Sequence, residues 1–165
     1  MKEFSIPLKH KYERPIIELY GLSALIDTGA VIPMISEAPT ILEEKFFGKK
    51  VLDNGTIGGI GGETDGWVYS IPNFQIGDLV FENFEVFVPY ESDLKFQILL
   101  CAPMFYGMSY TFDTIEEKFT VKMKDNQNLK RDFKIKNLKG RLYPQVDGIL
   151  LQKIDIIKQD YTIFI

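Results

Sequence analysis

The sequence contains a single cysteine and a single histidine among its 165 residues. Cys101 therefore has no partner for a disulfide within the chain, which favours a reducing compartment, the cytoplasm. His10 lies between two lysines and is expected to be a solvated surface residue. Because structural metals are usually held by several His and Cys side chains, we expect no metal site within one chain.

Long apolar runs are also missing. No stretch approaches the ~20 apolar residues that cross a bilayer. Residues 1–14 are charged and hold no apolar segment of the kind found in signal peptides. We therefore expect no membrane helix and no membrane partner.

Positive charge is scarce in the first three quarters of the chain and more frequent at its end. Residues 1–124 carry 11 Lys and Arg against 18 Asp and Glu, whereas residues 125–165 carry 8 against 5. A basic segment can bind nucleic acid. Here the basic residues alternate with Phe133, Ile135 and Leu138, which is typical of a half-exposed strand, and the net charge is −4. Nucleic-acid binding is therefore the weakest interpretation.

The composition favours an all-β domain. Hydrophobic residues make up 45% of the chain and include 13 Phe and 8 Tyr, and aromatic residues fit strands well. Short strand patterns separated by turns predict a single domain over residues 1–165, a closed β-barrel with one or two short helices.

The expected elements follow from local patterns. Ser36 is the expected N-cap of a short helix over residues 36–47, and a second short helix is expected over 103–107. Residues 148–157 fit either a strand or a helix. Strands are expected over 16–26 (two strands joined at Gly21), 67–71, 74–88 (a hairpin), 96–100, 110–123 (a hairpin), 132–136 and 162–165.

The segment Asp27-Thr28-Gly29-Ala30 carries the most chemical information. It follows the apolar pair Leu25-Ile26 and precedes a second apolar run. A carboxylate beside a core strand is costly unless hydrogen bonds satisfy it, so its presence there indicates chemistry. An ordinary β-turn is the alternative, because Asp and Gly are common turn residues. Gly29 is expected to permit a tight turn that a side chain would resist.

A glycine-rich motif lies about thirty residues further on, with the sequence Ile57-Gly58-Gly59-Ile60-Gly61-Gly62. A phosphate-binding loop is disfavoured, because no Lys-Ser/Thr pair and no helical pattern follow the glycines. A flexible hairpin tip is the simplest interpretation. Glycines interleaved with isoleucines also suit a mobile lid that folds over an extended substrate and excludes water.

Together these motifs resemble the retropepsins, the retroviral-type aspartic proteases, and the glycine-rich hexapeptide is similar to the lentiviral flap. A third segment stands where that family has an apolar strand end and a short helix, and it reads Ile98-Leu99-Leu100-Cys101-Ala102-Pro103-Met104-Phe105. The resemblance covers residues 15–124. Residues 125–165 are an extension, packed on this core or at a dimer interface, and 162–165 are expected to form either an interface strand or a strand of their own subunit.

The resemblance implies an endopeptidase that hydrolyses peptide bonds with a water activated by two Asp27 carboxylates. Since the chain has one Asp-Thr-Gly, the two carboxylates must come from the two subunits of a homodimer. It also implies that Thr28 bonds across the two-fold axis, that Gly29 and Ala30 support the catalytic loop, and that Ile60 lies at the flap tip. The substrate is an extended polypeptide, and no cofactor is needed.

One residue departs from the family pattern. Cys101 stands where retropepsins usually have glycine. Together with the extension, this departure supports an alternative, a weakly active or inactive retropepsin-like module for dimerisation or peptide binding. The intact Asp27-Thr28-Gly29 and the glycine-rich motif favour the enzyme. For Cys101 itself, a buried small residue is preferred over a redox-sensitive thiol.

Overall fold

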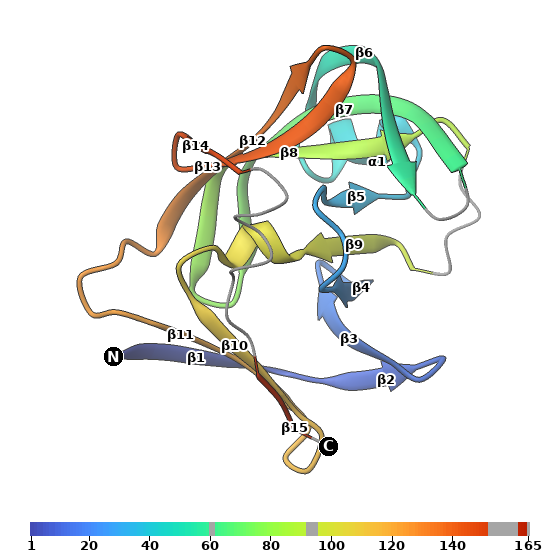
Figure 1. The fold of residues 1–165 in the computed structure, drawn as a ribbon. Helices are drawn as coiled ribbons and strands as arrows, with labels where there is room; N and C mark the ends of the chain where they lie inside the picture. The colour runs from blue at the N-terminus through green and yellow to red at the C-terminus, as the bar shows by residue number, and fades with distance from the viewer. Residues whose placement is uncertain (60–61, 92–95, 152–161, 165) are drawn as a thin grey trace.

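A computed structural model describes residues 1–59, 62–91, 96–151 and 162–164. These residues form an all-β fold of two sheets with one short α-helix and one short 3-10 helix (Figure 1). The smaller sheet has the strand order β1-β11-β10-β15 and lies in the lower part of the view of Figure 1, next to β2 and β3 of the larger sheet. Its strands are β1 (Lys2–Pro7), β11 (Lys118–Met123), β10 (Ser109–Asp113) and β15 (Thr162–Phe164).

The larger sheet has eleven strands. Its main path runs β14-β13-β12-β8-β5-β9-β4-β3-β2, while β7 branches from β8 and carries β6. The pairings among the described residues do not join the two ends of this path, so this part of the chain forms an open sheet rather than the expected closed barrel. The strands are β2 (Lys9–Lys11), β3 (Arg14–Leu19), β4 (Leu22–Asp27), β5 (Met34–Ile35), β6 (Lys49–Gly59), β7 (Gly62–Ile76), β8 (Leu79–Pro89), β9 (Ile98–Cys101), β12 (Lys130–Leu138), β13 (Arg141–Val146) and β14 (Ile149–Leu150).

The core is rich in aromatic side chains contributed by strands that are distant in sequence. Phe74 stacks on Phe84 with ring centroids 4.4 Å apart, and Phe133 of β12 lies 5.7 Å from Phe84. In β12, Phe133 and Ile135 are buried while Lys134 between them is partly exposed, as the period-2 alternation of a strand requires. Residues beyond 124 therefore share one core with the preceding segment.

Most expected strands are present. Residues 14–27 form β3 and β4 with a turn at Gly21, where φ is +75°. The hairpin of β7 and β8 turns at Gly77, and that of β10 and β11 turns within residues 114–117. The strand expected over 132–136 is longer, and the strand expected over 162–165 is found at Thr162–Phe164.

The first helix is shorter than expected. Helix α1 spans Pro39–Glu44, and its N-cap is Ala38 without a side-chain hydrogen bond, so the assignment of Ser36 as N-cap is wrong. The Ser36 N–H instead donates to the Gln97 carbonyl at 2.8 Å, which ties it to the strands. Pro39 starts the helix because its fixed φ suits the first turn and it needs no N–H partner there.

The second short helix begins one residue earlier than expected. It is the 3-10 helix η1 (Ala102–Phe105), placed directly after β9. Ile149 and Leu150 form strand β14, which gives the start of the ambiguous segment 148–157 an extended structure. Its remainder from 152 on, together with Ile60, Gly61 and residue 165, lies outside the described residues.

The extension is joined to both sheets. Strand β12 runs parallel to β8 and forms a hairpin with β13. Strand β15 runs parallel to β10 of the same chain, so its described backbone pairs within its own subunit.

Candidate active site

Asp27 is the last residue of β4, a strand in the middle of the larger sheet. β4 is flanked by antiparallel β3 and parallel β9. Ala24, Leu25 and Ile26 are buried, with no more than 4% of their surface exposed, and Asp27 is half-buried. An apolar strand with a paired strand on each side thus ends in a carboxylate that is partly exposed and lines a cavity.

Backbone hydrogen bonds fix the turn that follows. The Gly29 N–H donates to Oδ1 of Asp27 at 2.9 Å, and the Ala30 N–H donates to the Asp27 carbonyl at 3.2 Å. These bonds fix the position of Oδ1 and the path of the backbone after Asp27. Gly29 is not among the glycines with positive φ, and a Cβ there would lie 3.4 Å from Asp27 Oδ1, an ordinary contact. The expectation that Gly29 is needed for the turn itself is therefore wrong.

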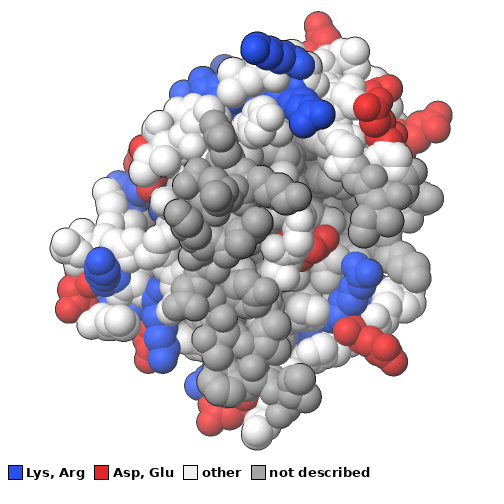
Figure 2. Space-filling model, viewed as in Figure 1, with Lys and Arg blue, Asp and Glu red and all other residues white. Residues whose placement is uncertain are grey.

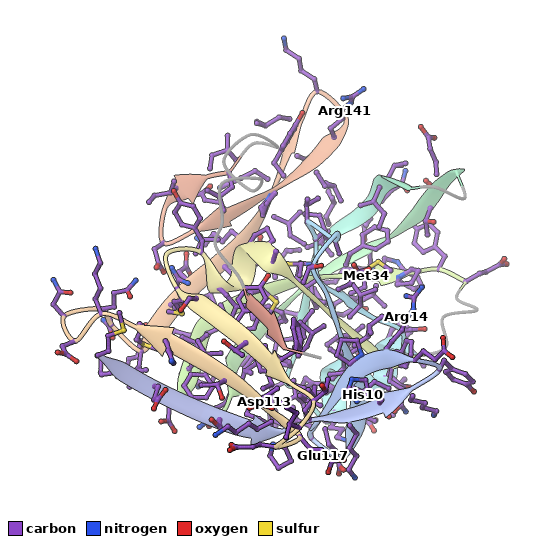
Figure 3. All side chains as sticks on the ribbon, turned by 60° about the horizontal axis from the view of Figure 1, so that its bottom comes forward. His10, Arg14, Met34, Asp113, Glu117 and Arg141 are labelled. Carbon is purple, nitrogen blue, oxygen red and sulfur yellow. The ribbon has the colours of Figure 1, made fainter. Side chains whose placement is uncertain are left out.

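A cavity of about 640 Å³ opens in front of this turn. Asp27 and Thr28 form one side of it, and residues of the β2–β3 hairpin form another, namely His10, Glu13 and Arg14. Figure 3 shows His10 and Arg14 on this hairpin. His10 is exposed, as expected. Its position beside the Asp27 cavity was not predicted from the sequence.

The β2–β3 hairpin reaches the cavity through backbone pairing. Strand β2 pairs with β3 in the register His10 to Pro15, and β3 pairs with β4. Sequence reasoning missed this neighbour because Lys9-His10-Lys11 has no apolar pattern. The only available signal was that the segment immediately precedes a strand expected to pair with β4.

The glycine-rich motif is the end of a long hairpin of β6 and β7. Gly58 faces Glu63 and Gly59 faces Gly62 in the antiparallel register, while Ile60 and Gly61 lie outside the described residues. The Thr56 hydroxyl donates to Asp65 Oδ1 at 2.8 Å across the two strands. The described part of the motif is therefore paired as an antiparallel hairpin, and its role as a flap stays a prediction.

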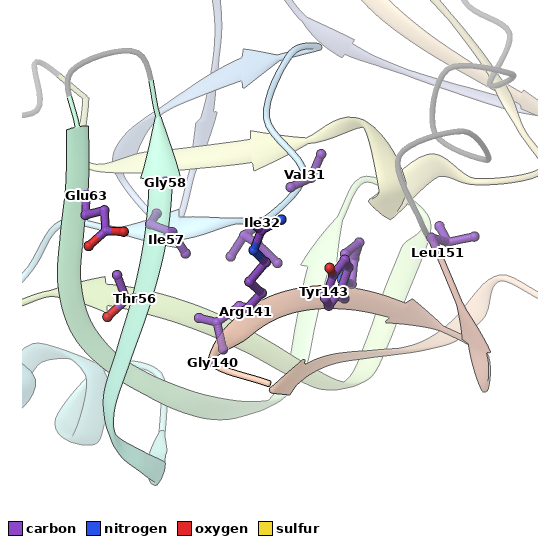
Figure 4. Close-up of a pocket in the computed structure, with 12 residues that line it drawn as sticks. Val31, Ile32, Thr56, Ile57, Gly58, Glu63, Gly140, Arg141, Tyr143 and Leu151 are labelled. Atoms are coloured by element: carbon purple, nitrogen blue, oxygen red, sulfur yellow. The ribbon is translucent and has the colours of Figure 1, made fainter. Parts of the chain in front are cut away.

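Ile57 and Gly58 of this hairpin line a second cavity, of about 500 Å³ (Figure 4). Val31 and Ile32 form its floor, and they follow directly on the Asp27 turn. The structure thus brings the glycine-rich hairpin to the chain segment after the Asp27 turn. It does not place Asp27 and the described residues of this hairpin in one cavity.

Cys101 lies beside Asp27 but is inaccessible. The two residues are register partners at the ends of β9 and β4, and Cys101 has no exposed surface. Burial, and to a smaller extent the charge of Asp27, raises the pKa of the Cys101 thiol well above its usual range. The thiol is therefore protonated and unreactive, which agrees with the preferred interpretation of a buried small residue.

Cys101 also needs none of the conformational freedom of glycine. Its φ of −116° and ψ of 157° belong to ordinary extended backbone. Its N–H donates to the sulfur of Met104 at 3.5 Å, at the start of η1. The departure from the family glycine therefore introduces no backbone strain next to Asp27.

Among the described residues, no group of three or more His, Cys, Asp or Glu side chains is arranged to hold a metal ion. None of the helices in this part of the chain is long and apolar enough to cross a membrane. Comparison with family models, curated proteins and solved structures gives no significant match.

Proposed function

We propose that the protein is an aspartic endopeptidase whose active site is completed by a second copy of the chain. The observation that carries this proposal is the position of Asp27, at the end of a buried strand. The Gly29 N–H donates to one oxygen of its carboxylate, and Asp27 and Thr28 line a cavity. The strand pair β4 and β9, the short strand β5 and the β6–β7 hairpin support a retropepsin-type arrangement.

Two carboxylates are needed because amide hydrolysis requires both a base and an acid. Like charges held close together cannot both ionise, so the pair of Asp27 side chains shares one proton. The ionised carboxylate takes a proton from the attacking water, and the protonated one polarises the substrate carbonyl. The pair titrates as a unit, so neither carboxylate has a pKa of its own.

A homodimer supplies the second carboxylate most directly. Within the described part of the chain, Glu13 is the one other acid that lines the Asp27 cavity. It is exposed, and it lies in a turn at φ +61°. No Thr-Gly turn follows it. A second Asp27 related by a two-fold axis would have the same turn and the same orientation.

The flap and the floor suggest how a peptide binds. An extended polypeptide would lie between the β6–β7 hairpin and the segment after Asp27, with backbone hydrogen bonds to the glycine-rich strand ends. Flap closure over the peptide would exclude bulk water from the two carboxylates.

The test is cleavage of casein, an unstructured protein, by the purified protein between acid and neutral pH, with and without pepstatin. We expect pepstatin-sensitive cleavage that Asp27→Asn abolishes, while sedimentation equilibrium shows a dimer for both proteins. Activity retained in Asp27→Asn, or a monomer that cleaves, would overturn the mechanism. A dimer that binds peptides without cutting them would identify the alternative, a peptide-binding module.

A further inference from the structure

The extension contributes a wall to the cavity beside the glycine-rich hairpin. Gly140, Arg141, Leu142 and Tyr143 line this cavity together with Ile57 and Gly58 from the opposite side (Figure 4). A Cβ on Gly55 of β6 would lie 3.2 Å from Leu142 Cδ1, so the two hairpins are in contact. The extension is therefore part of the same cleft as the flap.

The wall is firmly anchored near the active-site strands. Arg131 is only 7% exposed, and it donates to the Met104 carbonyl of η1 and to Oδ2 of Asp147, both at 3.1 Å. Asp147 Oδ1 in turn accepts the N–H of Asp132 at 2.8 Å. Because η1 follows directly on Cys101, these bonds connect the base of the β12–β13 hairpin to the end of β9.

The tip of the hairpin is equally well defined. Leu138 pairs with Arg141, which leaves Lys139 and Gly140 as a two-residue turn with φ values of 52° and 82°. Positive φ at both central residues is the geometry of a tight type I′ hairpin turn. Arg141 therefore starts β13 at a fixed position, and Figure 4 shows its side chain extending from the tip toward Ile32.

Arg141 has no charged partner among the described residues, although it lies at an otherwise mostly apolar cavity. Glu63 of β7 lines the same cavity and makes no ion pair with Arg141. Residues 130–141 contain six Lys and Arg and a single Asp. Figure 2 shows basic side chains gathered at the top of the molecule, over β6, β12 and β13, while acidic ones lie over the flap side.

We propose that this cavity is a substrate subsite in which Arg141 of the extension selects an acidic side chain of an extended polypeptide. The inference rests on the proposed function for the direction of the peptide, which lies along the flap. Val31, Ile32, Ile57 and Leu142 hold the aliphatic part of a Glu side chain, and its carboxylate meets the guanidinium. A guanidinium and a carboxylate can form two parallel hydrogen bonds, which gives geometric selectivity as well as attraction.

The experiment separates binding from cleavage. The full-length Asp27→Asn protein is incubated with a library of bead-bound random decapeptides, and the retained peptides are sequenced. The same library is then offered to Asp27→Asn proteins that also carry Arg141→Glu or Lys139→Glu. Lys139 is the matched control. It is exposed, its replacement by Glu changes the net charge by the same amount as Arg141→Glu, and it does not line the cavity.

We expect Asp and Glu to be enriched at one peptide position by about twofold to fivefold, as one exposed ion pair allows. Arg141→Glu should abolish or reverse this preference, and Lys139→Glu should retain it. No acidic preference, a preference that survives Arg141→Glu, or an absence of retained peptides would overturn the proposal. Casein cleavage by the unmodified protein judges the proposed function separately. Acid-selective binding without cleavage refutes the peptidase alone, and cleavage with no acid-selective binding refutes the subsite alone.

Discussion

Asp27 and Cys101 face each other as register partners at the ends of the parallel strands β4 and β9. Asp27 is half-buried at a cavity, and Cys101 is completely buried. A thiol whose pKa is raised by burial thus lies next to the carboxylate proposed to do the chemistry. This relationship has a measurable consequence for stability in alkaline solution.

The free energy of unfolding should fall as the pH rises above the ordinary thiol pKa of about 8.5. Burial raises the pKa of Cys101 in the folded protein, so in this range the unfolded chain releases a proton that the folded chain keeps. Stability from this group is complete below the unfolded pKa and declines above it, by roughly 1.4 kcal/mol per pH unit. Urea unfolding between pH 7 and 10 measures the slope.

Cys101→Ala is the control for this slope, because the small side chain fits the extended backbone and does not titrate. The slopes of the free energy of unfolding against pH should differ between the two proteins by the contribution of one proton. All other titrating groups are the same in both. Equal slopes would show that the thiol ionises as readily in the folded state as in the unfolded chain.

Gly66→Ala should destabilise the protein strongly. A Cβ at this position would lie 2.4 Å from the Val88 carbonyl oxygen and 2.7 Å from Phe87, so the strands β7 and β8 would have to separate. Forcing atoms into a packed core costs roughly 1–3 kcal/mol, and more where the backbone must move. Gly58→Ala, where a Cβ meets nothing within 4 Å, should cost no more than about 0.5 kcal/mol. Thermal unfolding of both variants checks the contrast, and similar losses would contradict the packing described.

Asp147→Ala should cost about 2–4 kcal/mol, because it leaves the buried Arg131 without its counter-charge. Glu82→Ala is the matched control, since Glu82 pairs with Lys130 at 3.8 Å on the surface and such pairs contribute little. Urea unfolding measures both. A small effect of Asp147→Ala would show that Arg131 is satisfied by the Met104 carbonyl and by water.

Glu13→Gln tests whether the second carboxylate comes from the same subunit. Glu13 lines the Asp27 cavity but lies on an exposed turn. We expect casein cleavage to remain within about threefold of the unmodified protein, whereas a carboxylate of the catalytic pair would cost several orders of magnitude. Loss of activity in Glu13→Gln, with an unchanged melting temperature, would place both acids in one chain and remove the need for a dimer.

Local patterns in the sequence predicted a large part of this fold. The apolar run before Asp27, the alternation in β12 and the turn at Gly77 each depend on neighbouring residues, and each is found in the structure. The length of α1 was overestimated because the tie between Ser36 and Gln97 joins residues about sixty positions apart. The periodicity of a short segment contains no information about such a partner.

The residues that line the two cavities were harder to predict, because strand pairing brings them together from segments that are distant in the sequence. Strand β12 pairs with β8 in parallel across about fifty residues, and this pairing carries Arg141 to the cavity beside the glycine-rich hairpin. Lys139-Gly140-Arg141 resembles any basic turn when it is examined alone. His10 likewise reaches the Asp27 cavity through the pairing of β2 with β3, in a segment with no pattern of its own.

The chain has one tryptophan, and it lies on the hairpin that carries the glycine-rich motif. Trp67 is half-buried, and its ring packs edge-on against Tyr90 with centroids 4.5 Å apart. Tyr90 in turn donates its hydroxyl proton to the Asp53 carbonyl of β6. The tryptophan fluorescence of the protein therefore comes from a single indole at the base of the glycine-rich hairpin. Stopped-flow tryptophan emission would report the proposed binding of a peptide there without any added label.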